Sequence, residues 1–253
     1  ICMKYILQSL SIGETIMAGT GAERQETGFV NAINSAVKKN KGKGIRVHTP
    51  GRSLTNIIRA EKFSGRSAAG TEPYTDVVLH SQGGRRWNIS MKGESAPSLA
   101  GGGLEGLELI VPGIGRRFIR SACSAYIRAG YKRGADLPDA YATVPTNLKT
   151  KIVVGTSAMG GPIHYMYQGP MDVVSRYDAR SSILTVNGKL TPSNQFASQY
   201  KLIFRLRRRR SDRKFLLEND RGGKDKRGLP MITQGRRIMV VDSIPRVAFK
   251  VRI

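Results

Sequence analysis

The chain has 253 residues, of which 40% are hydrophobic, and its 42 lysines and arginines against 18 aspartates and glutamates give a formal net charge of +24. This composition and length exclude a disordered chain and allow a sizeable core, and the lack of any run of 18 apolar residues excludes a membrane-spanning helix. A positive charge of this size attracts polyanions, nucleic acid foremost among them, although docking on an acidic protein shell is an alternative.

The first predicted element is a helix over 23–39, "ERQETGFVNAINSAVKK". Apolar residues recur at helical spacing from Phe29 to Val37, and lysines gather at the C-terminal end, where the helix dipole favours them. Glu26 lies three residues before Phe29 and therefore projects toward the core. A carboxylate is costly there unless it has a function.

The next segments predict a short helix over 53–63 and then a β-hairpin. Residues 75–80 alternate as a strand, "SQGGRR" forms the turn, and residues 87–92 alternate again. This alternation places Ser90 and Lys92 on the same face of the second strand.

After a glycine-rich loop, residues 116–129 predict an amphipathic helix with Arg116 and Arg117 on its outer side. A proline-spaced linker is expected from there to residue 149. The rest of the chain is strand-rich, with "VNGK" as a turn signal. Strands are predicted over 151–156, 164–174, 182–190, 200–210, 236–242 and 247–253.

The hairpin carries the residues with the clearest chemistry. Asp76 at the start of one strand and Lys92 on the adjacent strand would bring both side chains to one edge of the sheet. A carboxylate can hold a divalent metal that activates water against a phosphodiester, and a nearby lysine can stabilise the developing charge. An ordinary hairpin with a solvated Lys92 is the alternative.

Asp76, Ser90 and Lys92, preceded by Glu26 on a helix, resemble the PD-(D/E)XK nuclease superfamily over residues 23–130. The resemblance implies a mixed sheet flanked by helices in the order α-β-β-β-α-β. It also implies that Asp76 and Glu26 bind Mg²⁺ or Mn²⁺ and that Lys92 is the catalytic lysine.

The chain departs from this family at Ser90, because family members have an acidic residue two positions before the lysine. A hydroxyl is a poor neutral ligand for Mg²⁺, so the site has one negative charge fewer. Either Glu26 could supply the missing charge, or Glu94 could, if the strand continues through Gly93.

The predicted fold is α/β, a restriction-endonuclease-like mixed sheet with a strand-rich basic C-terminal half. Residues 1–16 are expected to be an extension ahead of a start at Met17, residues 17–150 the nuclease-like core, and 151–253 a β-rich region packed on it. The segments "ISMKGESAPSLAGGG", "MGGPIHYMYQGPMDV" and "FRLRRRR" also resemble uncharacterised proteins of large tailed bacteriophages. That resemblance implies a location in the cytoplasm of an infected bacterium or in the virion.

A dense run of positive charge, "FRLRRRRSDRK", predicts a strip that follows a phosphate backbone, since arginine bridges phosphate oxygens bidentately. The alternative is an edge for subunit docking. Contacts of this kind give affinity but no sequence choice. The residues assigned to nucleic-acid binding are Arg205, Arg207, Arg208, Arg209, Arg210, Arg213 and Lys214, with Arg116 and Arg117.

The sequence therefore predicts a metal-dependent nuclease acting on DNA in preference to RNA, with a homo-oligomer or a virion component as possible assemblies. The alternative is a catalytically inactive DNA-binding virion or packaging protein, which the neutral Ser90 favours. An RNA-binding assembly factor is a third interpretation, disfavoured because few aromatic residues are placed for base stacking.

Overall fold

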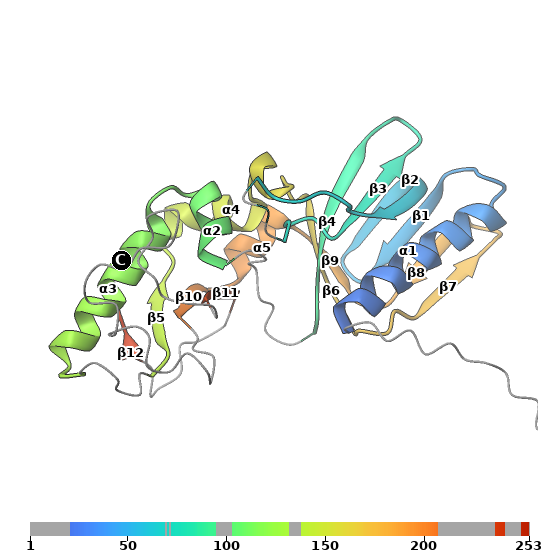
Figure 1. The fold of residues 1–253 in the computed structure, drawn as a ribbon. Coiled ribbons are helices and arrows are strands. Elements are labelled where there is room, and N and C mark those ends of the chain that lie inside the picture. The colour runs from blue at the N-terminus through green and yellow to red at the C-terminus, as the bar shows by residue number, and fades with distance from the viewer. Residues whose placement is uncertain are drawn as a thin grey trace, which may run out of the picture.

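The computed structural model describes residues 21–68, 70, 72–94, 103–131, 138–206, 236–240 and 249–252. These residues form two sheets, one of eight strands and one of four, which lie side by side with helices packed on them (Figure 1). The predicted α/β class with a mixed sheet and flanking helices is confirmed at this level.

The larger sheet has the strand order β7-β8-β1-β2-β3-β4-β6-β9. Helix α1 lies across it and contacts β1, β2 and β4 (Figure 1). Its elements are α1 (Gly21–Lys39), β1 (Ile45–Thr49), β2 (Arg52–Lys62), β3 (Val77–Ser81), β4 (Arg86–Lys92), β6 (Tyr165–Gln168), β7 (Ser175–Asp178), β8 (Ile183–Val186) and β9 (Lys189–Pro192).

The smaller sheet has the order β11-β10-β5-β12 and is covered by helices from the middle of the chain. Its elements and helices are α2 (Gly103–Ile110), α3 (Ile114–Arg128), β5 (Ala140–Thr143), α4 (Thr146–Val154), the 3₁₀ helix η1 (Ser157–Met159), α5 (Ser193–Gln199), β10 (Leu202–Leu206), β11 (Arg236–Val240) and β12 (Phe249–Lys250).

The strands β2, β3 and β4 follow one another antiparallel, and β6 then pairs with β4 in parallel. The connection from β4 to β6 contains α2, α3 and α4, which suits the long crossover that parallel strands require. The strands of residues 165–192 complete the sheet begun by residues 45–92.

Each sheet has its own apolar core, and the two cores meet at β6. Because side chains alternate along a strand, Tyr165 and Tyr167 belong to the core under α1, whereas Met166 belongs to the core of the smaller sheet. The segment entering β3 divides in the same way: Tyr74 packs in the smaller core and Val77 in the larger. Residues between Tyr74 and Val77 therefore lie at the boundary of the two cores.

The helices predicted over 23–39 and 116–129 and the hairpin of β3 and β4 are confirmed, as is the turn between β8 and β9. The helix predicted over 53–63 is wrong, because this segment is strand β2. Its buried residues recur every three positions, at Leu54, Ile57 and Ala60. The pairing shifts register beside them, and a β-bulge of this kind imitates helical spacing.

Two further predictions in the middle of the chain are wrong. Residues 151–156, expected as a strand, belong largely to α4, which buries Ile152 and Val153, ends at Val154 and is capped by Gly155 with a φ of 71°. The expected linker to residue 149 contains the buried strand β5. Both apolar segments are short, and periodicity alone does not separate a buried strand from a short buried helix.

Candidate active site

The carboxylate of Asp76 is the centre of a polar cluster at the start of β3. Its Oδ2 atom accepts hydrogen bonds from the Ser90 hydroxyl at 3.0 Å and from the backbone N–H of Met91. The ammonium of Lys92 lies 3.5 Å from the same oxygen. We call Asp76, Ser90, Lys92 and the nearby Glu26 the Asp76 cluster.

The backbone holds Asp76 in a fixed place between two strands. Its N–H donates to the carbonyl of Ile89 at 3.0 Å, and its carbonyl accepts from the N–H of Phe63 at 2.9 Å. The side chains of Asp76 and Lys92 are only 15% and 16% exposed. Charges this shielded interact more strongly than they would on an open surface.

Glu26 approaches the cluster from α1. Its carboxylate lies 3.4 Å from the ammonium of Lys62, and its side chain is 24% exposed. Burial raises the pKa of Glu26, and the negative charge of Asp76 raises it further, whereas Lys62 and Lys92 act in the opposite direction. Two neighbouring carboxylates that repel one another would be stabilised by a cation.

These carboxylates have the ligand chemistry that Mg²⁺ and Mn²⁺ prefer, which is oxygen. Within the described residues, no group of three or more His, Cys, Asp or Glu side chains is placed to hold one ion. An ion here would therefore rest on Asp76 and Glu26 and complete its shell with oxygens of water or substrate. Mg²⁺ commonly keeps several waters in this way.

Gln25 is a further residue of the site, and the sequence analysis missed it. Its side chain is buried, with 1% of the residue exposed, and its amide Nε2 donates to the carbonyls of Lys92, Gly169 and Pro170 at 3.1, 2.8 and 3.0 Å. This amide ties α1 to the ends of β4 and β6, and so positions the adjacent Glu26. The available signal was a glutamine four residues before the buried Phe29.

Glu94, considered as a substitute ligand, is exposed and follows the end of β4 at Lys92. Its charge contributes to the environment of Tyr167, where burial first and Glu94 second raise the pKa of the phenol to about 12. The described contacts of Asp76 do not include Glu94.

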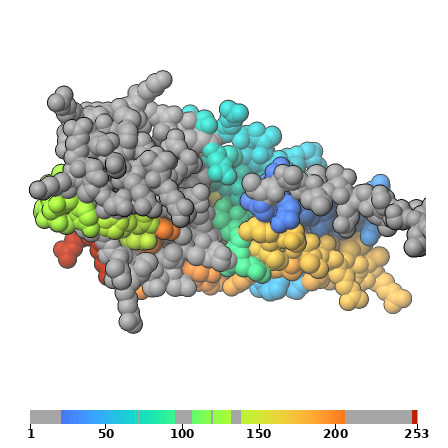
Figure 2. Space-filling model, turned by 60° about the horizontal axis from the view of Figure 1, so that its bottom comes forward, coloured from blue at the N-terminus to red at the C-terminus, as the bar shows by residue number. Residues whose placement is uncertain are grey.

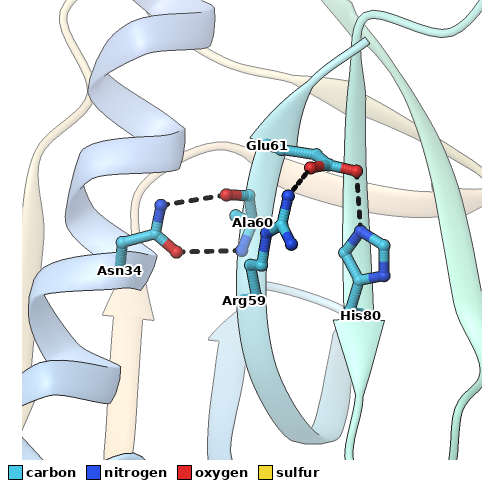
Figure 3. A network of polar contacts seen from close by, with 5 residues as sticks. All are labelled: Asn34, Arg59, Ala60, Glu61 and His80. Atoms are coloured by element: carbon cyan, nitrogen blue, oxygen red, sulfur yellow. Dashed lines mark hydrogen bonds and ion pairs between the residues drawn. The ribbon is translucent and has the colours of Figure 1, made fainter.

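His80 lies on β3 but contacts a different carboxylate, that of Glu61 on β2 (Figure 3). Its Nε2 lies 2.9 Å from Glu61, which also pairs with the guanidinium of Arg59. These contacts, that of His80 first, lower the pKa of Glu61. Asn34 on α1 holds the same strand by bonding both backbone groups of Ala60 at 2.9 Å (Figure 3).

The predicted nucleic-acid-binding residues are divided between described and undescribed parts of the chain. Arg205 lies on β10, where its guanidinium bonds Asp139 at 2.8 and 2.7 Å and lies over the Tyr141 ring, so a structural ion pair compensates its charge. Arg116 and Arg117 are exposed in the first turn of α3. Outside the described residues lie Arg207, Arg208, Arg209, Arg210, Arg213 and Lys214.

Comparison with protein-family models, with curated proteins and with solved structures found no match to this chain. The interpretation of the Asp76 cluster therefore depends on its residues, distances and position in the sheet. Across the part of the chain that the structure describes, no helix is both long and apolar enough to cross a membrane.

Proposed function

We propose that this chain is a metal-dependent nuclease of the PD-(D/E)XK type that hydrolyses phosphodiester bonds, with DNA favoured over RNA as the substrate. The observation that carries the proposal is the geometry of Asp76. This shielded carboxylate lies 3.5 Å from the Lys92 ammonium and close enough to Glu26 to raise its pKa. In this proposal Asp76 and Glu26 hold Mg²⁺ or Mn²⁺.

The order of elements around the cluster supports the proposal. Helix α1 precedes the antiparallel strands β2, β3 and β4, and helices then lead to β6, parallel to β4. With β1 and β5 set aside, this order resembles the α-β-β-β-α-β order that the resemblance implies, and the sheet has four further strands, β1, β7, β8 and β9. The location of Asp76 just before β3 and of Lys92 at the end of β4 supports the proposal, because the resemblance implies an aspartate and a lysine on adjacent strands.

The residues of the cluster have distinct parts in this reaction. The bound ion would polarise the phosphodiester and lower the pKa of the attacking water. Ser90 and the N–H of Met91 fix the orientation of the Asp76 carboxylate. Lys92, no longer needed to balance Asp76 once a cation is present, can hold the charge that develops on the phosphate oxygens. Gln25 keeps α1 against β4 and so preserves the distance between Glu26 and Asp76.

One observation favours a second function, that of a catalytically inactive nucleic-acid-binding protein of a virion or packaging machine. Ser90 is buried, with 4% of the residue exposed, and its hydroxyl donates to Asp76. The position is therefore neutral, and the cluster has two carboxylates where a third would strengthen metal binding. In this alternative the chain binds nucleic acid through its excess of positive charge, and the Asp76 cluster only stabilises the fold.

The proposal is tested by incubating the purified chain with supercoiled plasmid, linear duplex, single-stranded DNA and RNA, in Mg²⁺, Mn²⁺ or EDTA. Asp76→Asn and Lys92→Met are compared with Asp178→Asn and Lys189→Met, which change exposed residues of β7 and β9. We expect metal-dependent cleavage that falls at least about 100-fold in the first pair only.

Two other results would count against the nuclease. Nucleic acid bound but uncut in every metal would establish the inactive alternative. Cleavage that persists unchanged in both Asp76→Asn and Lys92→Met would place the chemistry elsewhere in the chain.

A further inference from the structure

A second concave surface lies away from the Asp76 cluster, between α3 and the residues of β12 and its C-terminal continuation. The cavity has a volume of about 480 Å³, within the range of small-ligand pockets. The C-terminal residues lie directly beside α3 in the space-filling view (Figure 2). The lining residues are Arg120, Ser121, Ser124, Ala125, Arg128, Lys250, Val251 and Arg252.

Among the residues that the structure describes, the charged side chains lining this α3–β12 pocket are all positive. Arg120 and Arg128 line one wall and Lys250 and Arg252 the other, and the described lining includes no carboxylate. On β10, by contrast, Asp139 balances the charge of Arg205. Four cations converging on one concavity repel each other, and an anion bound between them would remove that cost.

The remaining lining groups suit an anion with several oxygens. Arg120, Ser124 and Arg128 follow one another at intervals of four positions on α3, and Ser121 lies three positions before Ser124, so these residues share one side of the helix. Hydroxyls donate single hydrogen bonds, and guanidinium groups bind phosphate oxygens in pairs. Val251 is the buried apolar residue of the lining. This combination recognises phosphate groups rather than an apolar ligand.

We propose that the α3–β12 pocket binds consecutive phosphates of a nucleic-acid backbone. The pocket belongs to the smaller sheet, whereas the Asp76 cluster lies at the boundary with the larger one. A nucleic acid bound here would be anchored at a distance from the bond to be cut. The described lining residues include no aromatic side chain and offer phosphate contacts only, so we expect binding to be independent of base sequence. This pocket proposal rests on the proposed nuclease function only in naming nucleic acid, and not another phosphate compound, as the ligand.

The test is fluorescence anisotropy of a labelled 30-base-pair duplex and a 30-nucleotide single strand, with all measurements in EDTA. The double variant Arg120→Gln/Arg128→Gln is compared with Arg176→Gln/Arg180→Gln, which removes the same charge from exposed residues of β7 and the turn after it. We expect the pocket variant to lose about tenfold in affinity for nucleic acid, and the slope of log K against log salt to fall by about two. The control should bind as the native chain does.

Equal losses in the pocket and control variants would overturn the proposal, because net charge alone would then explain binding. Native-like binding by the pocket variant would overturn it as well. Sodium tripolyphosphate is the competitor: tight binding of this probe together with unchanged nucleic-acid binding in the pocket variant would assign the pocket to a free polyphosphate. Arg120→Lys/Arg128→Lys should retain most of the affinity, which separates loss of charge from loss of folding.

EDTA keeps this result independent of cleavage. If the chain proves not to be a nuclease, the pocket variant should still lose nucleic-acid affinity. If the pocket proposal fails, Asp76→Asn should still lose metal-dependent cleavage.

Discussion

The ion pair between Asp76 and Lys92 gives the sharpest prediction for stability. Asp76→Asn retains an oxygen that can accept from Ser90 and the Met91 N–H but removes the charge, and Lys92→Met removes the ammonium while keeping most of the side-chain length. A double-mutant cycle of these two changes isolates the interaction between the charges.

The size of the coupling follows from the geometry. At 3.5 Å, two unit charges attract by about 5 kcal/mol at an effective dielectric constant of about 20. The water that still reaches each side chain, about one-sixth exposed, screens part of this attraction. We therefore expect a coupling free energy of about 1–3 kcal/mol, above the value of up to about 1 kcal/mol that is typical of exposed pairs.

The assay is urea unfolding at pH 7 in EDTA, followed by the fluorescence of Trp87, the only tryptophan of the chain. All four members of the cycle should unfold with the same dependence on urea, so that the midpoints report stability. A coupling below about 0.5 kcal/mol would refute the reasoning, because the two charges would then be screened from each other as on an open surface.

Three further predictions concern the residues around this pair. Burial and the charge of Asp76 hold the pKa of Glu26 above its ordinary value of 4.5, so just above pH 4.5 the folded chain binds more protons than the unfolded chain, and this group lowers stability as pH rises. Glu26→Gln lacks this effect and should therefore become more stable relative to the unmutated chain as pH rises. A stability difference that stays constant from pH 4 to 7 would contradict this. Gln25→Leu should lower the free energy of unfolding by about 1–3 kcal/mol, because it removes the side-chain donor from the carbonyls of Gly169 and Pro170. Gln195→Leu, at an exposed position, should have little effect in the same urea assay. Mg²⁺ at ten times its dissociation constant should stabilise the native chain by about 1.4 kcal/mol in calorimetry, and equal stabilisation of Asp76→Asn would place the ion elsewhere.

Much of the region around the Asp76 cluster was predictable from the sequence, because its signals are local. Alternation along residues 87–92 and the turn before them predicted the hairpin, and helical spacing predicted α1 with Glu26 facing inward. Asp76 and Lys92 then meet because the hairpin register pairs Val77 with Ile89. Asp76 comes just before Val77 and Lys92 comes soon after Ile89, and in an antiparallel pair these two directions lead to the same end of the hairpin.

Other features depend on contacts between distant parts of the chain and could not be predicted in this way. Strand β2 was mistaken for a helix because a bulge gives its buried residues a spacing of three. The role of Gln25 depends on carbonyls at Gly169 and Pro170, more than 140 residues away. The α3–β12 pocket forms only when residues 250–252 return to α3, and no local pattern indicates that approach.

The central claim is that the carboxylates of Asp76 and Glu26 form a metal site, and a crystal grown with Mn²⁺ and a short DNA duplex tests it most directly. Anomalous scattering should place Mn²⁺ about 2.0–2.2 Å from an Asp76 oxygen, with Glu26 beside it and Lys92 turned from Asp76 toward a phosphate. DNA bound with no Mn²⁺ at Asp76, and with Lys92 still paired to that carboxylate, would contradict the claim and leave a nucleic-acid-binding protein that does not cleave.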